Sequence, residues 1–185
     1  MLIFTKGGDI LPKIIPNLKE TLIETAKFLL QNKGYGNFTI HQVAKECNIA
    51  MGTMYNYFPS KQVLIANVVL IDWNKTLKYM SRYSLESSTL LEGIQIIYVE
   101  LGKFIKNYEI LFFSTSDDVI NNFSYFAQHK LLVEQISKVI KELEIKHNSH
   151  QNDILTNFIA ENIITYCTKR YDFILLVPIF SKIIS

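Results

Sequence analysis

The segment from Phe38 to Lys61 constrains the fold of this chain more than any other. Thr39 is a good helix N-cap, and Gln42 three positions later completes a capping box, in which each side chain pairs with a backbone N–H group that the helix leaves unpaired. A short helix is therefore predicted over residues 40–47. Its inward-facing positions, read from the helical period, are Val43, Ala44 and Cys47.

The residues that follow predict a sharp turn and a second short helix. Asn48 tolerates the left-handed backbone conformation better than any residue except glycine. Met51 to Tyr57 then have the length of a second helix, which Pro59 cannot continue, and Ser60 can cap a third. Helix, tight turn, helix is the helix-turn-helix geometry, whose second helix can enter the major groove of DNA.

The residues of this segment also resemble a known family. The runs Thr39-Ile-His-Gln-Val-Ala, Asn48-Ile-Ala-Met-Gly-Thr-Met-Tyr-Asn-Tyr-Phe and Pro59-Ser-Lys-Gln-Val-Leu are similar to the N-terminal domain of TetR-family transcriptional repressors. The resemblance covers roughly residues 18 to 66. It implies a DNA-binding head, a helical body that binds an effector, and dimerisation through the last helices as a four-helix bundle.

The sequence pattern in the rest of the chain predicts helices only, because no alternating strand pattern stands out. We expect an all-α protein with an N-terminal arm and head in residues 1–62 and a ligand-binding and dimerisation body in residues 63–185. Whether the arm supports DNA binding or packs on the protein stays open. Outside the helix-turn-helix, the expected helices are 17–33 with a stop at Gly34, 61–79 or 61–83, 89–113, 118–146 with a possible break near Gln128, 153–169, and 172–184 with a kink or division at Pro178.

Charge is distributed unevenly between the two parts. The net charge of the 185 residues is +2, but residues 1–80 carry nine Lys, no Arg and five acidic residues, and so +4, whereas residues 81–185 carry −2. A modestly basic N-terminal part is compatible with phosphate binding. The hydrophobic content of 49% and charged content of 19% are those of a globular chain and not of a disordered one.

Catalytic and metal-binding motifs have little support. Cys47 and Cys167 fit neither a disulfide framework nor a zinc spacing. The four His residues lie in no metalloprotease or nucleophile context, and His147 and His150 lack a clear third ligand. We therefore expect no enzyme activity, no cofactor and no metal. No signal peptide is recognisable, and the longest apolar run, residues 173–180, is far shorter than the ~18–20 residues of a membrane span, so a cytoplasmic setting without membrane contact is expected.

Candidate DNA contacts follow from position in the helix-turn-helix and from the resemblance. The candidates for contacts in the groove are Ala50, Met51, Gly52 and Tyr57. The candidates for phosphate contacts are Thr39, Thr53, Tyr55 and Lys61, with His41 and Lys45 also within possible reach and Asn56 beside them in an undecided direction. Lys45 could equally be a solvated surface charge, and Phe58 is expected in the core of the head.

Two departures from the family pattern bear on DNA preference. Ala50 stands where the family usually has a capping Ser or Thr, and the absence of that hydroxyl removes a hydrogen bond worth ~1 kcal/mol. No Arg precedes Arg82, so bidentate pairing of Arg with guanine is not possible in the head. We therefore predict weak dependence on guanine, readout of thymine methyl groups and groove shape, and an AT-rich operator.

Two groups of body residues are candidates for binding. Aromatic side chains in the body could line an effector pocket, although an ordinary packed core is the plainer interpretation of each ring. The candidates for the pocket are Trp73, Tyr98, Phe104, Tyr108, Phe112 and Phe126. The last two predicted helices are apolar over wide faces and so need burial, which a partner subunit can provide. The candidates for that interface are Leu155, Phe158, Ile159, Ile163, Leu176 and Phe180.

Together these features predict a homodimeric, ligand-responsive transcriptional regulator that acts as a repressor. Its partners would be a near-palindromic double-stranded DNA operator, a second copy of the chain, and a small, mostly apolar or aromatic effector. The alternative is a helical DNA-binding or protein-interaction factor that has no small-molecule effector.

Overall fold

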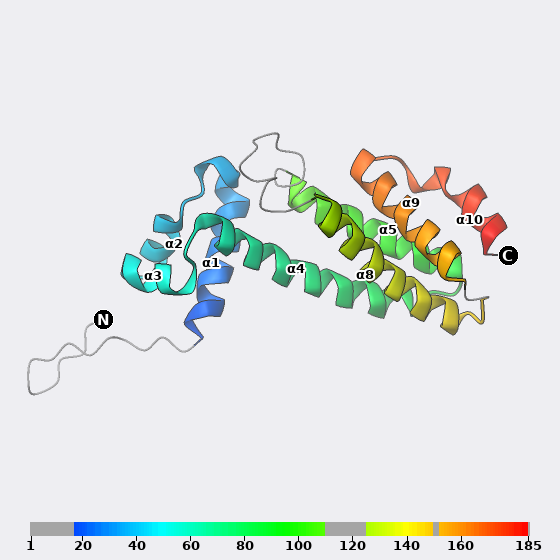
Figure 1. Ribbon diagram of the computed structural model, residues 1–185, viewed down its shortest axis with the longest axis horizontal. Helices are drawn as coiled ribbons and strands as arrows, with labels where there is room; N and C mark the ends of the chain where they lie inside the picture. Colours follow the sequence, from blue (N-terminus) through cyan, green and yellow to red (C-terminus); the bar gives the residue numbers. More distant parts are fainter. Residues whose placement is uncertain (1–16, 110–124, 150–151, 185) are drawn as a thin grey trace, which may run out of the picture. The chain divides into compact units, whose positions relative to one another are not determined.

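The computed structural model describes residues 17–109, 125–149 and 152–184. Every regular element in these ranges is helical, which confirms the predicted all-α class (Figure 1). The chain divides into two compact units, Met1–Val68 and Val69–Ser185, called the head and the body below. The N-terminal arm and Phe112 lie outside the described residues, and of Phe126 only the backbone is described.

The head begins with helix α1, Leu18–Asn37. Gly34 has a φ of 72° inside this span, so the regular helix is interrupted there and one further turn follows. Glycine adopts this left-handed conformation without a steric penalty, which is why the predicted stop falls at Gly34. The backbone N–H of Phe38 donates to the Gly34 carbonyl at 3.1 Å and closes the turn.

The helix-turn-helix forms where the sequence predicts it. Helix α2 spans Ile40–Glu46, and both hydrogen bonds of the Thr39–Gln42 capping box are present. Asn48 is left-handed, with a φ of 52°, and leads into α3, Met51–Tyr57. The Ser60 hydroxyl accepts from the Val63 N–H at 3.2 Å and caps α4, Lys61–Ser84.

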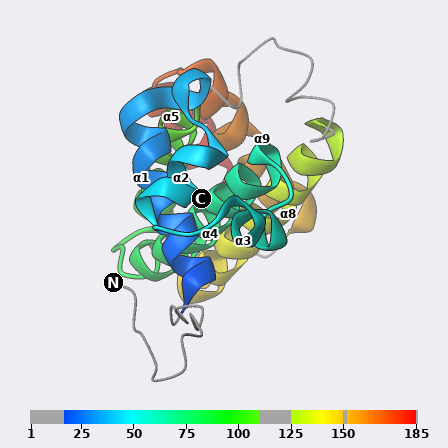
Figure 2. The ribbon, with the colours of Figure 1, turned by 90° about the vertical axis from the view of Figure 1, so that its left-hand side faces the viewer.

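Figure 2 shows the helices of the head from its side, and buried apolar side chains of α1, α2, α3 and the start of α4 form its core. Phe58 is 1% exposed and therefore belongs to this core, as predicted. Cys47 is only half-buried, and its thiol donates to the Thr25 hydroxyl at 3.3 Å. The side chains that fill the core are Leu22, Ile23, Ala26, Leu29, Leu30, Phe38, Ile40, Val43, Ala44, Met54, Phe58, Leu64, Ile65 and Val68.

The body contains the C-terminal part of α4 and four further elements. These are α5, Leu90–Asn107; α8, Tyr125–Lys146; α9, Asp153–Lys169; and a C-terminal pair, the 3-10 turn η1, Phe173–Leu175, and α10, Val177–Ile183. Helix α9 packs on both α5 and α8, and α10 also contacts α5. Two predictions for the body helices need correction, because α5 ends at Asn107 and not near Phe113, and α8 is continuous at Gln128. The last predicted helix is divided near Pro178, which is one of the two predicted outcomes: η1 ends at Leu175, and Pro178 lies in the first turn of α10. The first turn accepts proline because its N–H groups lack helical partners anyway.

Two close approaches determine how the body helices pack. Gly93 lies so near α8 that a Cβ atom there would be 2.4 Å from Leu143 Cδ2 and 2.9 Å from Ser87 Oγ. Buried Thr156 on α9 lies 3.0 and 2.9 Å from the two carboxyl oxygens of buried Glu144 on α8.

No helix within the described residues is long and apolar enough to cross a membrane.

Candidate nucleic-acid interface and body sites

Helix α3 divides its residues between the core of the head and solvent. Met54 is fully buried, and Phe58 directly after the helix is buried beside it. Tyr55 is 46% exposed and Tyr57 is 41% exposed, so neither ring is a core residue. The other predicted contacts on or next to this helix follow the same division: Ala50, Gly52 and Asn56 are exposed, and Met51 and Thr53 are half-buried.

The exposed residues of α3 are spaced to share one face. Gly52, Tyr55 and Asn56 are three and four positions apart, which is the spacing of neighbours on a helix surface. A Cβ at Gly52 would meet nothing within 4 Å, so the backbone there is open to an approaching partner. In a helix-turn-helix, the exposed face of the second helix is the one that can enter a major groove.

The predicted phosphate contacts outside α3 are exposed, with the exception of Lys61. Thr39, His41 and Lys45 are exposed at or on α2. The Lys61 ammonium instead donates to the Tyr35 carbonyl at 2.7 Å and lies 4.2 Å from the centre of the Tyr35 ring. Burial lowers the pKa of this ammonium from its ordinary value.

Helix α3 lacks a side-chain cap, as the sequence predicts. Ala50 occupies the N-cap position in an extended conformation, and no side chain accepts from the first amides of the helix.

Three of the predicted effector residues form one aromatic cluster in the body, defined here as Trp73, Phe104 and Tyr108. The ring centroids of Trp73 and Phe104 are 4.9 Å apart, and those of Phe104 and Tyr108 are 5.2 Å apart. All three are buried. Their polar ends are paired, since Trp73 Nε1 donates to Gln135 Oε1 at 2.6 Å and the Tyr108 hydroxyl donates to Asp72 Oδ2 at 2.6 Å.

Tyr98 does not join this cluster. Its ring packs on Phe173 with centroids 5.1 Å apart, and its hydroxyl donates to the Tyr171 carbonyl. Burial raises the pKa of the Tyr98 hydroxyl, with smaller contributions of the same sign from Cys167 and Asp172. Tyr98 therefore joins α5 to the C-terminal elements.

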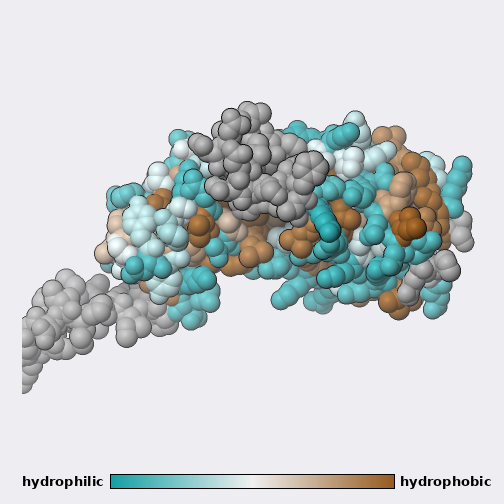
Figure 3. All heavy atoms as spheres, in the orientation of Figure 1, coloured by the Kyte–Doolittle hydropathy of each residue, from teal (hydrophilic) through white to brown (hydrophobic). Residues whose placement is uncertain are grey.

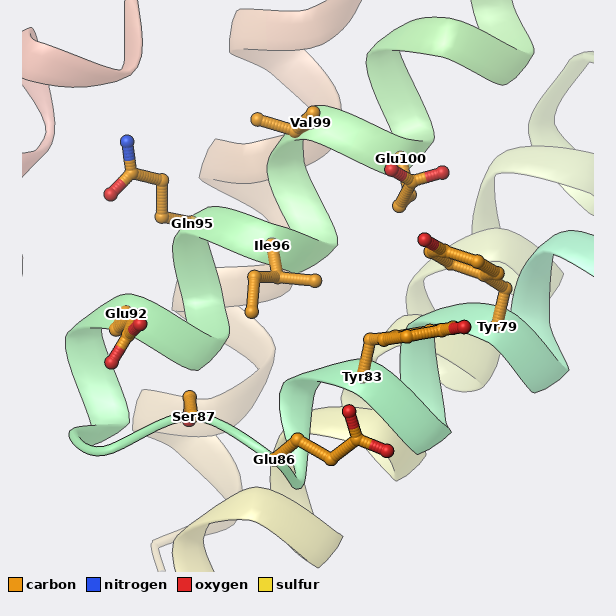
Figure 4. A pocket seen from close by; sticks show the side chains of 9 residues that line it. All are labelled: Tyr79, Tyr83, Glu86, Ser87, Glu92, Gln95, Ile96, Val99 and Glu100. Carbon is orange, nitrogen blue, oxygen red and sulfur yellow. The ribbon is translucent and has the colours of Figure 1, made fainter.

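A groove of about 500 Å³ opens elsewhere in the body, between the end of α4 and the start of α5 (Figure 4). Tyr79 and Tyr83 stack with centroids 3.9 Å apart on the α4 side. Ile96 and Val99 face it from α5. Its remaining lining residues are polar or acidic: Glu86, Ser87, Glu92, Gln95 and Glu100. None of the predicted effector residues lines this groove.

Four of the six predicted interface residues need correction. Ile159, Ile163, Leu176 and Phe180 are buried within the protomer and therefore have no surface to offer a partner. The amphipathic pattern correctly marked them as apolar but could not tell the protomer's own core from an interface. Leu155 is half-buried, and Phe158 is 42% exposed.

Several apolar side chains of α9 and of the C-terminal elements nevertheless remain exposed, and Figure 3 shows hydrophobic residues on the visible face of this part of the body. Ile154 and Phe158 are exposed four positions apart on α9, and Ile174, the most exposed apolar residue of η1, is 64% exposed. Further exposed apolar side chains of this surface, called the C-terminal apolar surface below, are Tyr171, Leu175 and Ile179.

Sequence reasoning missed the polar partners of the buried aromatic residues. Asp72 and Gln135 satisfy Tyr108 and Trp73, and Tyr35 receives Lys61. A polar residue next to a predicted core aromatic is a weak signal for such a role. The partners are 36, 62 and 26 positions apart, so no local pattern could have paired them. Within the described residues, no group of three or more His, Cys, Asp or Glu side chains could hold a metal ion.

Comparison with known proteins agrees with this geometry. Residues 22–68 match the sequence model of the family described as bacterial regulatory proteins, tetR family. The uncharacterized HTH-type transcriptional regulator YuxN of Bacillus subtilis (strain 168) is 40% identical over 58 residues, which are 31% of this chain and 20% of YuxN. This chain therefore spans only about a fifth of that relative's length in the match. HTH-type transcriptional regulator SAB2452 of Staphylococcus aureus (strain bovine RF122 / ET3-1) is 23% identical over 173 residues, covering 76% of this chain and 89% of that protein.

Solved structures share the fold over most of the chain. A transcriptional regulator of the TetR/AcrR family from Thermobifida fusca has a TM-score of 0.57 and 18% identity, covering 85% of this chain and 87% of that one. The fatty acid degradation regulator FadR from Bacillus halodurans has a TM-score of 0.55 and 16% identity, covering 90% and 93%. Residues 22–68 therefore carry the DNA-binding domain of the TetR family of helix-turn-helix transcriptional regulators.

Proposed function

We propose that this regulator is a homodimeric repressor that binds a near-palindromic operator and is released by a small, mostly apolar or aromatic effector. The observation that carries the DNA-binding part is the exposed face of α3, held on a buried three-helix core. Two such heads would occupy half-sites separated by a whole number of helical turns. The absence of Arg before Arg82 favours an AT-rich site.

DNA binding is tested with the duplex upstream of the protein's own gene. Tyr55→Ala and Asn56→Ala change exposed residues of α3 and should weaken binding without changing the Tm. Gln31→Ala, at an exposed position of α1, is the matched control and should bind as the wild type does. Wild-type affinity in both α3 variants would contradict the proposed interface. Replacing the guanines of the mapped site should cost less than the ~1–3 kcal/mol typical of a specifically read base pair.

The dimer is supported by the C-terminal apolar surface. Ile154 and Phe158 on α9, together with Ile174 on η1, leave apolar area in solvent that a second copy could cover. Phe158→Glu should convert the dimer to a monomer in sedimentation experiments, because the new charge would be buried without a partner. Leu131→Glu places the same charge on an exposed apolar position of α8 and is the control. A wild-type protein that sediments as a monomer at micromolar concentration would contradict the proposal.

Release by an effector is supported by the aromatic cluster of Trp73, Phe104 and Tyr108. An effector that binds one arrangement of the body more tightly would shift the population of that arrangement, and α4 extends from the head into the body. The measurement is the Kd for operator DNA with and without the candidate effector. Equal Kd values for the true effector would refute release.

One observation favours the alternative without an effector. The rings of the aromatic cluster already pack on one another, and their polar atoms are paired within the chain. A cluster filled in this way can be an ordinary core. Mass spectrometry of small molecules that copurify with the native protein separates the two proposals, because a body built as a plain core should retain none.

A further inference from the structure

Lys61 makes its contacts within the head. It is the first residue of α4, and its ammonium donates to the Tyr35 carbonyl at 2.7 Å. The same nitrogen is 4.2 Å from the centre of the Tyr35 ring and 5.7 Å from the centre of the Phe38 ring. A cation within ~6 Å of an aromatic face is attracted by the ring, and more strongly where water is partly excluded.

The contact also moves the Lys61 charge away from the start of α4. Tyr35 lies in the single turn that follows the interruption of α1 at Gly34, and its carbonyl accepts from the Lys61 ammonium. A lysine in the first turn of α4 is unfavourable for that helix if its charge stays there. Reaching across to the Tyr35 carbonyl moves the charge away from the start of α4 and places it at the end of α1.

The chain between these two residues contains the whole helix-turn-helix. Tyr35 and Lys61 are 26 positions apart, and α2 and α3 lie between them. Phe38 is fully buried beneath the ammonium. The Lys61 side chain therefore links the two ends of the segment that contains α2 and α3.

We infer that Lys61 is a positioning residue: its ammonium joins the start of α4 to the end of α1 and so fixes α3 for DNA, instead of contacting a phosphate itself. This inference rests on the proposed DNA-binding function. The lowered pKa of the ammonium agrees with its partial burial against Tyr35.

The salt dependence of DNA binding distinguishes positioning from phosphate contact. Lys61→Met keeps the length of the side chain and removes the charge, and Lys19→Met at an exposed position of α1 controls for lost net charge. On a mixed-sequence duplex, Lys61→Met should weaken binding roughly 2- to 10-fold at every salt concentration. Its slope of log K against log salt should equal that of Lys19→Met. A lost phosphate contact would make the slope for Lys61→Met less steep than that of the control by about 0.9, and this result would overturn the inference.

A thermal-unfolding cycle supplies the second readout. Tyr35→Leu removes the ring but leaves the carbonyl, and Tyr35→Phe keeps the ring as a conservative control. Lys61→Met and Tyr35→Leu should each lower the Tm, and the double variant should lower it by less than the sum of the two. Lys61→Arg, which keeps the charge and a donor, should restore most of the Tm and the affinity. Full additivity of the two single changes would overturn the inference.

A failure of the proposed DNA-binding function can be told apart from a failure of the inference about Lys61. If the wild type binds neither operator nor mixed-sequence duplex, the proposed function fails. The thermal cycle then still decides whether the Lys61–Tyr35 contact holds the head together, because it needs no DNA.

Discussion

The head and the body of this protein are both helical, but they are specified by different kinds of contact. In the head, the signals lie within a few positions of one another: the Thr39–Gln42 capping box, left-handed Asn48 and the Ser60 cap. In the body, the determining contacts join distant residues, such as Trp73 to Gln135 and Glu144 to Thr156. The difference explains why the head could be predicted almost residue by residue and the body only as a set of apolar helices.

The head and the body also differ in where their polar side chains lie. The candidate DNA contacts of the head are mostly exposed, and its core is apolar apart from the Lys61 ammonium at its edge. The body buries polar side chains between helices, including Ser87, Ser137, Glu144 and Thr156. Ser137 Oγ donates to Asn157 Oδ1 at 2.8 Å, another link between α8 and α9. Buried hydrogen bonds of this kind require one particular helix arrangement, which apolar packing alone does not.

The largest effect is expected from emptying the core of the head. Phe58→Ala removes a side chain that is 1% exposed and should destabilise the head by about 3–5 kcal/mol. Tyr55→Ala, three positions earlier and exposed, should cost less than about 0.5 kcal/mol. Denaturant unfolding followed by Trp73 fluorescence and by circular dichroism measures both. Since Trp73 lies in the body, a loss of helix signal before the fluorescence changes would show that the two units unfold separately.

The next effect concerns the packing of the body. Gly93→Ala places a Cβ 2.4 Å from Leu143 Cδ2 and should destabilise the body by about 1–3 kcal/mol, because buried Leu143 has to move. Gly102→Ala on the same helix meets nothing within 4 Å and should stabilise it by about 0.5–1 kcal/mol through helix propensity. Equal Tm values for the two variants would show that α5 and α8 are not pressed together at Gly93.

A smaller effect tests the local signals of the head. Thr39→Ala removes the cap of α2 and should cost about 1 kcal/mol. Ala50→Ser adds the hydroxyl that α3 lacks and should gain up to about 1 kcal/mol. Thermal unfolding of the two variants should therefore shift the Tm in opposite directions. A loss of stability in Ala50→Ser would mean that the new hydroxyl does not reach the amides of α3.

The last expectation is a pH dependence of the body. Burial raises the pKa of Glu144 above its ordinary value, although the Thr156 hydroxyl and Lys141 oppose this. The folded state then holds its proton at pH values where the unfolded chain has lost it, so stability falls as pH rises through the folded pKa. Glu144→Gln keeps an acceptor for Thr156 and removes the charge. Its Tm should exceed that of the wild type at neutral pH and approach it below pH ~4. A constant difference in Tm from pH 4 to 8 would exclude this cause.

The sequence by itself determined the helical class, the positions of the helix-turn-helix and its resemblance to the TetR family. These depend on capping, turn conformation and helical period, which act over a few positions. Tertiary structure alone decided that Ile159, Ile163, Leu176 and Phe180 belong to the protomer's core, and that Lys61 faces Tyr35. An apolar pattern says that a side chain is buried but not against what, and the partner of a polar group depends on folding that brings distant residues together.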